Sequence, residues 1–370
     1  MMQKMTAAPI TQKQKRNLYI SYIKGVAIIG IMLIHTINWS NINLPRWGEV
    51  FEDWLHAAVF LFVLTTGSVL YVAYQHRTVA QQWKRLLHRA GTLLFIYYLY
   101  SIIKLLIFNF STEPFYLQFI NKGTFTVSDI LAFHSFSVPI TVLITYAFLL
   151  ALAPLILLIS KRSRYAAWVL SLLTVGIFVL NYFTPLSVIN NPIIQFVYAK
   201  GYIAFPVMLW IVPLLMGFIL AQIGFERQRL WLLIGGGVST LVTMGVLLHH
   251  HESLELSAYE FPLEPYFIFA GVLCLALFIY VFRFLERVRN KWMKWFLAVI
   301  RLLGDNTLHI YILHWVVIDL TIWLVAPTVT WIWVMVPLFV IGYLIWSRKK
   351  LFSYYRYQRE AARDLGAELI

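Results

Sequence analysis

The sequence predicts an all-α fold, a polytopic integral membrane helix bundle of about ten transmembrane helices with both termini in the cytoplasm. Of its 370 residues, 61% are hydrophobic and only 12% are charged, whereas soluble domains are about 45–50% apolar and about 25% charged. The mean hydropathy is +0.74, because long apolar runs follow one another along most of the chain. The placement of positive charge supports the same fold.

Ten apolar segments are long enough, or nearly so, to cross about 30 Å of hydrocarbon. They cover residues 18–39, 54–74, 90–110, 138–160, 165–183, 203–224, 229–249, 263–283, 302–325 and 328–347. Residues 127–133, between the third and fourth segments, predict a short interfacial helix. We therefore expect one membrane domain over residues 1–347. The remaining residues, 348–370, predict a basic cytoplasmic tail that lies near anionic lipid.

Positive charge alternates between the connecting segments. Of the 30 Lys and Arg residues, 25 fall in segments that are cytoplasmic if both termini are inside, and only Arg46, Lys122 and Lys200 fall in outer ones. This is the positive-inside pattern, and it accounts for the net charge of +14 without nucleic acid as a partner. Most acidic residues fall outside. A polyanionic ligand is therefore expected to approach from the cytoplasm, and a neutral or polyhydroxyl acceptor from the other side.

The first apolar segment carries two ionisable residues, Lys24 and His35. Eleven helical residues rotate by about 1100°, which is about 20° past three turns, and rise by about 16 Å. The two side chains therefore share one helix face, and ionisable groups at such depth are functional candidates. Lys24 is a candidate anchor for an anionic group, and His35 a candidate general base because imidazole titrates near neutrality. The alternative is that Lys24 extends to the inner interface and His35 is solvated at the outer one.

Two further stretches are candidate site segments. Residues 60–68 combine Thr66 and neighbouring small residues with a glycine, which allows close helix packing, and Arg85 and Arg89 follow in a basic cluster that could bind phosphate. Residues 304–314 place Asp305 and His309 at i,i+4 and Tyr311 and His314 at i,i+3 if they form one helix. His314 is then expected to face the bundle, and Asp319 is a candidate carboxylate that orients a catalytic group. Solvation explains the three histidines at residues 249–251 better than a metal site, and we expect no metal.

These segments resemble the membrane-bound acyltransferase 3 family. That family has Arg-Gly in its first span and a His after ten intervening residues, often with an Asp before the Arg. In this chain Lys24-Gly25 and His35 keep the spacing. Two residues differ: Lys24 replaces the Arg, and Ser21 replaces the Asp. Residues 62–67 are similar to the family's Phe-Phe-x-x-Ser-Gly element, and residues 303–314 to its Leu-Gly-x-x-Ser-x-x-Ile-Tyr-x-x-His segment. The chain also resembles the related heparan-α-glucosaminide acetyltransferase-like family.

The resemblance implies transfer of an acyl group, acetyl above all, from cytoplasmic acetyl-CoA or another acyl-CoA to a hydroxyl of a cell-envelope or exported glycan, or of its lipid-linked precursor. It implies that His35 is the catalytic base, that Lys24, Arg85 and Arg89 bind the donor, and that Tyr311, His314 and Thr66 support the substrate. The expected location is a bacterial cytoplasmic (inner) membrane. Two alternatives remain: a transporter or flippase that uses Lys24, Lys104 and His314 as a relay, and a catalytically silent acyltransferase-like binding protein.

Overall fold

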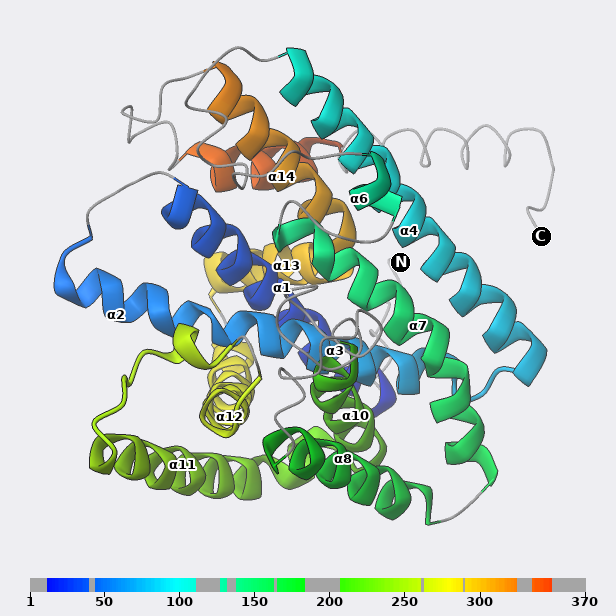
Figure 1. Cartoon of the computed structure of the whole chain (residues 1–370). Coiled ribbons are helices and arrows are strands. Elements are labelled where there is room, and N and C mark those ends of the chain that lie inside the picture. Colours follow the sequence, from blue (N-terminus) through cyan, green and yellow to red (C-terminus); the bar gives the residue numbers. More distant parts are fainter. Residues whose placement is uncertain are drawn as a thin grey trace, which may run out of the picture.

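The structure is a bundle of helices, as the sequence predicts (Figure 1). It is a computed structural model that describes residues 12–39, 44–110, 127–131, 138–162, 165–183, 207–260, 263–288, 290–324 and 335–347, and these residues contain no strand. The predicted cytoplasmic tail over residues 348–370 lies outside the described residues.

The described helices follow the apolar segments of the sequence closely. They are α1 (Gln12–Trp39), α2 (Arg46–Leu55), α3 (Ala57–Tyr74), α4 (Val79–Phe110), α6 (Val127–Leu131), α7 (Val138–Arg162), α8 (Ala166–Phe183), α10 (Val207–Ile223), α11 (Phe225–His249), the 3-10 helix η2 (Leu256–Tyr259), α12 (Pro265–Arg287), α13 (Lys291–Asp305) and α14 (Thr307–Leu324). A final apolar helix covers Met335–Ser347. The short helix predicted near residue 130 is present as α6. The hydroxyl of Tyr97 in α4 donates a hydrogen bond to the carbonyl oxygen of Ile130 in α6 (3.2 Å).

The predicted count of ten spans is not confirmed. By length and composition, six helical segments of the described chain can cross a membrane, and a seventh is possible if the pair α13 and α14 forms one span. Three further predicted spans appear as shorter apolar helices, over Trp168–Ile177, Val207–Ile223 and Met335–Ser347. Each of these ranges adjoins residues whose backbone or side chains lie outside the description, and the helix α8 itself extends over Ala166–Phe183.

One predicted span is broken. Residues 302–325 were expected to form one helix, but α13 ends at Asp305, α14 begins at Thr307, and the two helices are bent by 85°. The break lies at Asn306, whose backbone leaves helical geometry (φ −121°, ψ 25°). Its side chain donates a hydrogen bond to the carbonyl oxygen of Leu302 (2.6 Å), which satisfies one of the last carbonyl groups of α13. The expected i,i+4 pairing of Asp305 and His309 within one helix is therefore wrong.

Glycines allow two pairs of helices to cross in close contact. Where α1 meets α13, a Cβ added at Gly304 would lie 1.8 Å from the carbonyl oxygen of Ser21, and one added at Gly25 would lie 2.1 Å from that of Ile300. Where α3 meets α10, a Cβ at Gly217 would lie 1.7 Å from a backbone oxygen of α3. Small residues at helix crossings are typical of membrane bundles, because they let backbones approach closely.

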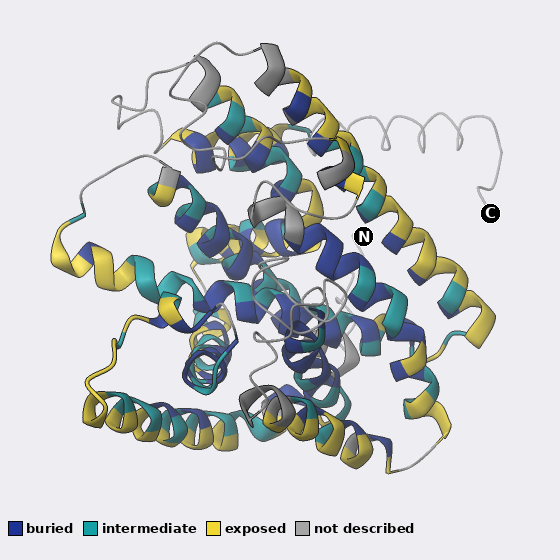
Figure 2. Cartoon of the chain, viewed as in Figure 1, coloured by how far each residue is buried: buried dark blue, intermediate teal, exposed yellow. Residues whose placement is uncertain are grey.

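Burial falls from the centre of the bundle to its periphery. Figure 2 shows mostly buried residues in α1, α3 and α10, and long exposed edges along α4 and α11. The exposed edges are themselves apolar: Trp231 is 71% exposed and Leu241 is 68% exposed. Contiguous exposed apolar surface is rare on soluble proteins, so we interpret these edges as facing lipid.

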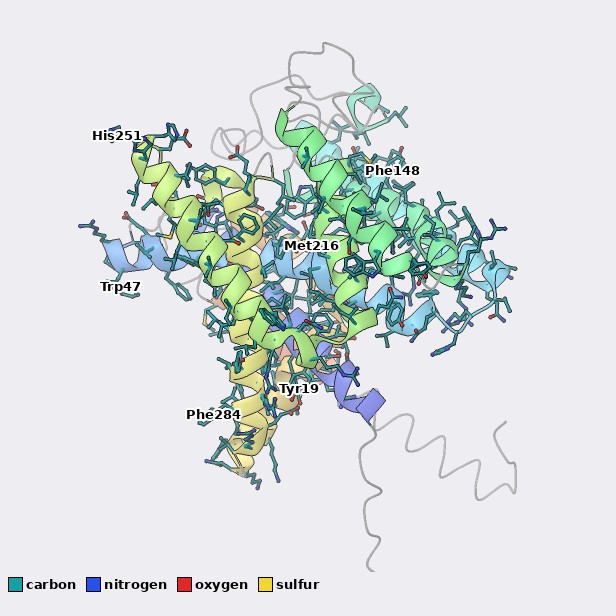
Figure 3. All side chains as sticks on the ribbon, turned by 90° about the horizontal axis from the view of Figure 1, so that it is seen from below. Tyr19, Trp47, Phe148, Met216, His251 and Phe284 are labelled. Atoms are coloured by element: carbon teal, nitrogen blue, oxygen red, sulfur yellow. The ribbon has the colours of Figure 1, made fainter. Side chains whose placement is uncertain are left out.

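The helix ends group as the charge pattern predicts. In Figure 3, Tyr19 and Phe284 lie near one end of the bundle, and His251 lies at the opposite end. The Tyr19 hydroxyl donates a hydrogen bond to a carboxylate oxygen of Glu286 (2.8 Å), which ties the start of α1 to the end of α12. Both of these helix ends belong to segments that the positive-inside pattern assigns to the cytoplasm.

Candidate active site

A pair of histidines lies between α1 and α14. The Nδ1 atom of His35 is 2.9 Å from the Nε2 atom of His314, and the two rings are nearly parallel, with centroids 5.3 Å apart. His314 is fully buried, whereas His35 is half-buried. The expectation that His314 faces the bundle is therefore met, and the structure brings it into contact with the histidine predicted to be the base.

The hydrogen bonds of the pair fix the tautomers of the neutral rings. The Nδ1 atom of His314 lies 3.0 Å from the carbonyl oxygen of Ile310, which can only accept, so this nitrogen carries the proton. The Nε2 atom of a neutral His314 is then an acceptor, and the Nδ1 atom of His35 must donate to it. It follows that the Nε2 atom of neutral His35 has a free lone pair. A chain of carbonyl, orienting histidine and basic histidine follows the logic of a catalytic triad.

Aromatic rings surround this pair. Trp315 lies with its ring centroid 4.4 Å from that of His35, and Tyr311 lies 5.2 Å from His314 in an edge-to-face arrangement. Both rings are buried. The site is therefore shielded from water on the side of α14, which strengthens electrostatic interactions within it.

Thr66 approaches the site from α3 and Tyr146 from α7. The hydroxyl of Thr66 donates to the carbonyl oxygen of Phe62 (2.9 Å) and lies beside the hydroxyl of Tyr146, which is within electrostatic range of Tyr311. Thr66 and Tyr146 therefore bring polar side chains of α3 and α7 close together. The sequence placed Thr66 in a candidate segment but gave no reason to single out Tyr146, since an apolar span with one Tyr is an ordinary packing pattern.

Lys24 lies toward the other end of α1, within electrostatic range of Asp305 and Arg89. The Asp305 carboxylate accepts a hydrogen bond from the Ser21 hydroxyl (2.7 Å), and Arg301 lies 3.7 Å from its other oxygen. A carboxylate from α13 therefore stands beside the cation. This carboxylate occupies the neighbourhood in which the resembled family often has an Asp at the position of Ser21.

Two arginines follow on α4. Both Arg85 and Arg89 are exposed, and Arg89 also lies over the ring of Tyr74, 5.9 Å from its centroid. The structure thus brings Arg89 toward Lys24 and leaves Arg85 on the neighbouring surface of the same helix. Together they make a basic surface at the Lys24 end of α1 that could bind an anion.

The sequence interpretation missed one polar cluster. His56, at the junction of α2 and α3, has its Nδ1 atom 2.5 Å from a Glu260 oxygen and its Nε2 atom 3.2 Å from a Glu52 oxygen. Burial raises the pKa of the Glu260 carboxyl, and its hydrogen bond with His56 opposes that shift. Asp53 accepts from the backbone amides of Leu256 and Ser257 (2.8 and 2.9 Å). The available signal was the i,i+4 spacing of Glu52 and His56.

Other candidates do not join the site. Asp319 accepts a hydrogen bond from the Tyr100 hydroxyl, so this contact runs to α4. His309 is exposed, as are the three histidines at residues 249–251. The side chain of Lys104 lies outside the described residues. Within the described chain, no group of three His, Cys, Asp or Glu residues could hold a metal ion.

The fold and the site define an integral membrane protein with a histidine pair at the centre of a helix bundle and a basic surface toward one end. The chain belongs to the acyltransferase 3 family: the family model for the acyltransferase domain matches residues 17–347. It is therefore a membrane acyltransferase. No curated protein matches the chain, and no solved structure matches it.

Proposed function

We propose that this protein transfers an acyl group, acetyl in the simplest case, from cytoplasmic acyl-CoA to a hydroxyl group of a cell-envelope or exported glycan, or of its lipid-linked precursor. The observation that carries the proposal is the His35–His314 pair, because its hydrogen bonds leave a free lone pair on the Nε2 atom of His35. Since His35 is half-buried and its partner fully buried, the acceptor hydroxyl reaches His35 first.

The donor approaches from the opposite end of α1. Its phosphates bind Lys24, Arg85 and Arg89, since cations on two helices can hold a polyanion. Lys24 and His35 lie on one face of α1, about 16 Å apart along the axis. A donor bound by its phosphates at one end can therefore extend its thioester along α1 toward His35.

In this reaction His35 is the catalytic base and His314 a positioning residue. The Nε2 atom of His35 takes the proton of the acceptor hydroxyl, and the imidazolium that forms keeps its Nδ1 proton and donates a hydrogen bond from it to His314. That hydrogen bond becomes charge-assisted, and such bonds are about twice as strong as neutral ones. The proton returns to the thiolate of CoA when it leaves. A positioned general base contributes about 10²–10⁴-fold to a rate.

The test uses purified protein in lipid nanodiscs with acetyl-CoA labelled in the acetyl group. Loss of label from CoA, to water or to a co-reconstituted cell-envelope fraction, is measured for wild type, His35→Ala and His309→Ala. We expect His35→Ala to lower the rate by at least about 10²-fold without loss of folding. The matched control, His309→Ala, changes an exposed histidine of α14 and should keep the rate.

Two results would contradict the proposal. Unchanged turnover by His35→Ala would remove the assigned base. A well-folded wild type that neither binds nor consumes acetyl-CoA would favour a catalytically silent binding protein, and solute flux without acyl-CoA would favour a transporter.

A further inference from the structure

Helix α13 exposes three large aromatic side chains along one edge. At about 3.6 residues per turn, they fall within about 100° of one another around the helix axis. The three are Trp292, Trp295 and Phe296, and they are 76%, 58% and 43% exposed. Asn290 fixes the start of this edge, because its side chain accepts a hydrogen bond from the Trp292 amide (2.9 Å). A row of exposed aromatic rings marks a surface that meets an apolar phase or a partner.

A basic edge lies beside the aromatic one. Lys291, Lys294 and Arg301 fall within about 80° of one another around the axis, and all three are exposed. The one acidic residue of α13, Asp305, accepts a hydrogen bond from Ser21 and lies 3.7 Å from Arg301. Lys291 and Lys294 therefore have no acidic neighbour within the helix, and this edge keeps a net positive charge.

The third face of α13 fixes the direction of the other two. It is buried, and its residues are Leu297, Ile300, Leu303 and Gly304. A Cβ added at Gly25 of α1 would lie 2.1 Å from the carbonyl oxygen of Ile300. Because α13 is held so closely on α1 by this face, it cannot roll to bury its aromatic or its basic edge against the same helix.

The bend after α13 sets the helix along the membrane surface. α14 has 18 residues and rises by about 27 Å, close to the hydrocarbon thickness of about 30 Å. It can therefore cross the membrane without α13, and α13, which is bent by 85° from it, lies nearly in the membrane plane (Figure 1). The positive-inside pattern assigns the connection between α12 and α14 to the cytoplasmic side.

We propose that α13 is an interfacial helix whose two exposed edges bind anionic phospholipid of the cytoplasmic leaflet. Trp292 and Trp295 enter the boundary between headgroups and acyl chains, and Lys291 and Lys294 contact the lipid phosphates, as Trp and Lys do on helices that lie in this boundary. Zwitterionic lipid would cover the aromatic edge but would not balance the charge of the basic edge. The inference does not depend on the proposed acyl transfer, because it concerns the faces of α13 that point away from α1.

The test measures how the purified full chain in detergent micelles binds fluorescent phosphatidylglycerol, by anisotropy and as a function of its mole fraction. Phosphatidylcholine with the same label is the comparison. Each Lys near an anionic surface strengthens binding by about fivefold, so Lys291→Gln combined with Lys294→Gln should weaken phosphatidylglycerol binding by about 25-fold. The charge-preserving pair Lys291→Arg and Lys294→Arg should bind as wild type does. The matched control, Arg162→Gln with Arg227→Gln, removes two exposed cations from α7 and α11 and should keep wild-type affinity.

The aromatic edge has its own variant. Trp292→Ala combined with Trp295→Ala should weaken the binding of both lipids, because these rings contact acyl chains that the two lipids share. The basic pair should instead change the preference between the two headgroups. This difference separates the roles of the two edges.

Four results would overturn the inference. Equal binding of the two lipids by wild type would remove the preference for an anionic headgroup. Equal losses in the two Gln pairs would show a general effect of net charge rather than a surface on α13. Unchanged binding in the Trp pair would remove the aromatic edge from the site. Displacement of phosphatidylglycerol by acetyl-CoA would assign the basic edge to the acyl donor.

Discussion

The crossing of α1 and α13 makes a quantitative prediction for Gly304→Ala. The added Cβ would lie 1.8 Å from the Ser21 carbonyl oxygen, whereas ordinary contact begins at 3.4 Å. The two helices must therefore separate by about 1.6 Å, the difference between these distances. Overpacking of this kind costs about 1–3 kcal/mol. Separation also strains the Ser21–Asp305 hydrogen bond, which is worth about 0.6 kcal/mol in a membrane protein.

Helix propensity opposes this cost, because alanine is favoured over glycine by about 1 kcal/mol in a helix. The net loss for Gly304→Ala is then about 2 kcal/mol in the free energy of unfolding. Activity should fall more steeply, since α1 carries Lys24 and His35 and a misplacement of about 1 Å can cost about 10²-fold in rate.

The assay is reversible unfolding in mixed detergent micelles, together with turnover of acetyl-CoA. Gly245→Ala is the matched control, because its Cβ in α11 meets nothing within 4 Å; it should be neutral or slightly stabilising. The reasoning is refuted if Gly304→Ala unfolds at the same denaturant concentration as Gly245→Ala and keeps wild-type activity.

Two other substitutions test the packing of the outer cluster and of α3. His56→Phe leaves the Glu260 carboxylate buried without its partner, which should cost about 3 kcal/mol at neutral pH. Burial raises the folded-state pKa of Glu260 above 4.5, so folding favours the protonated carboxyl. The loss in free energy of unfolding of His56→Phe relative to wild type should therefore shrink as pH falls toward 4.5. A loss that grows at low pH would contradict this sign. Ser68→Ala removes a hydrogen bond to the Gly217 carbonyl oxygen (2.9 Å) and should cost about 0.6 kcal/mol, measured by the same unfolding assay; a loss as large as that of Gly304→Ala would show that Ser68 does more than bond to α10.

The fold class was predictable because hydropathy and charge alternation are local and strong signals. The broken span was missed although Asn306 lies within Gly-Asp-Asn-Thr (residues 304–307), a run of turn and helix-cap residues. The surrounding apolar residues suggested one continuous span, and hydropathy carries no information on the 85° bend. The count of ten was not confirmed, because three of the predicted spans appear among the described residues only as shorter apolar helices.

The candidate site was predictable only in part. Helix periodicity placed Lys24 and His35 on one face, and the spacing in the last segment put His314 toward the bundle. The contact between His35 and His314 joins residues 279 positions apart, and no local pattern specifies such a pair. The His56 cluster was missed for the same reason, since Glu260 lies 204 positions away.

These sequence separations have a consequence for how the protein is made. Chains are synthesised at about 5–20 residues per second, so His314 follows His35 after roughly 14–56 s of translation over the 279 intervening residues. The partner of Ser21 on α13 arrives after a similar delay, 284 residues later. During this time α1 is already available for membrane insertion while its polar face has no native neighbours. Chains interrupted before residue 291 would retain that unpaired face, which makes them natural substrates for membrane quality control.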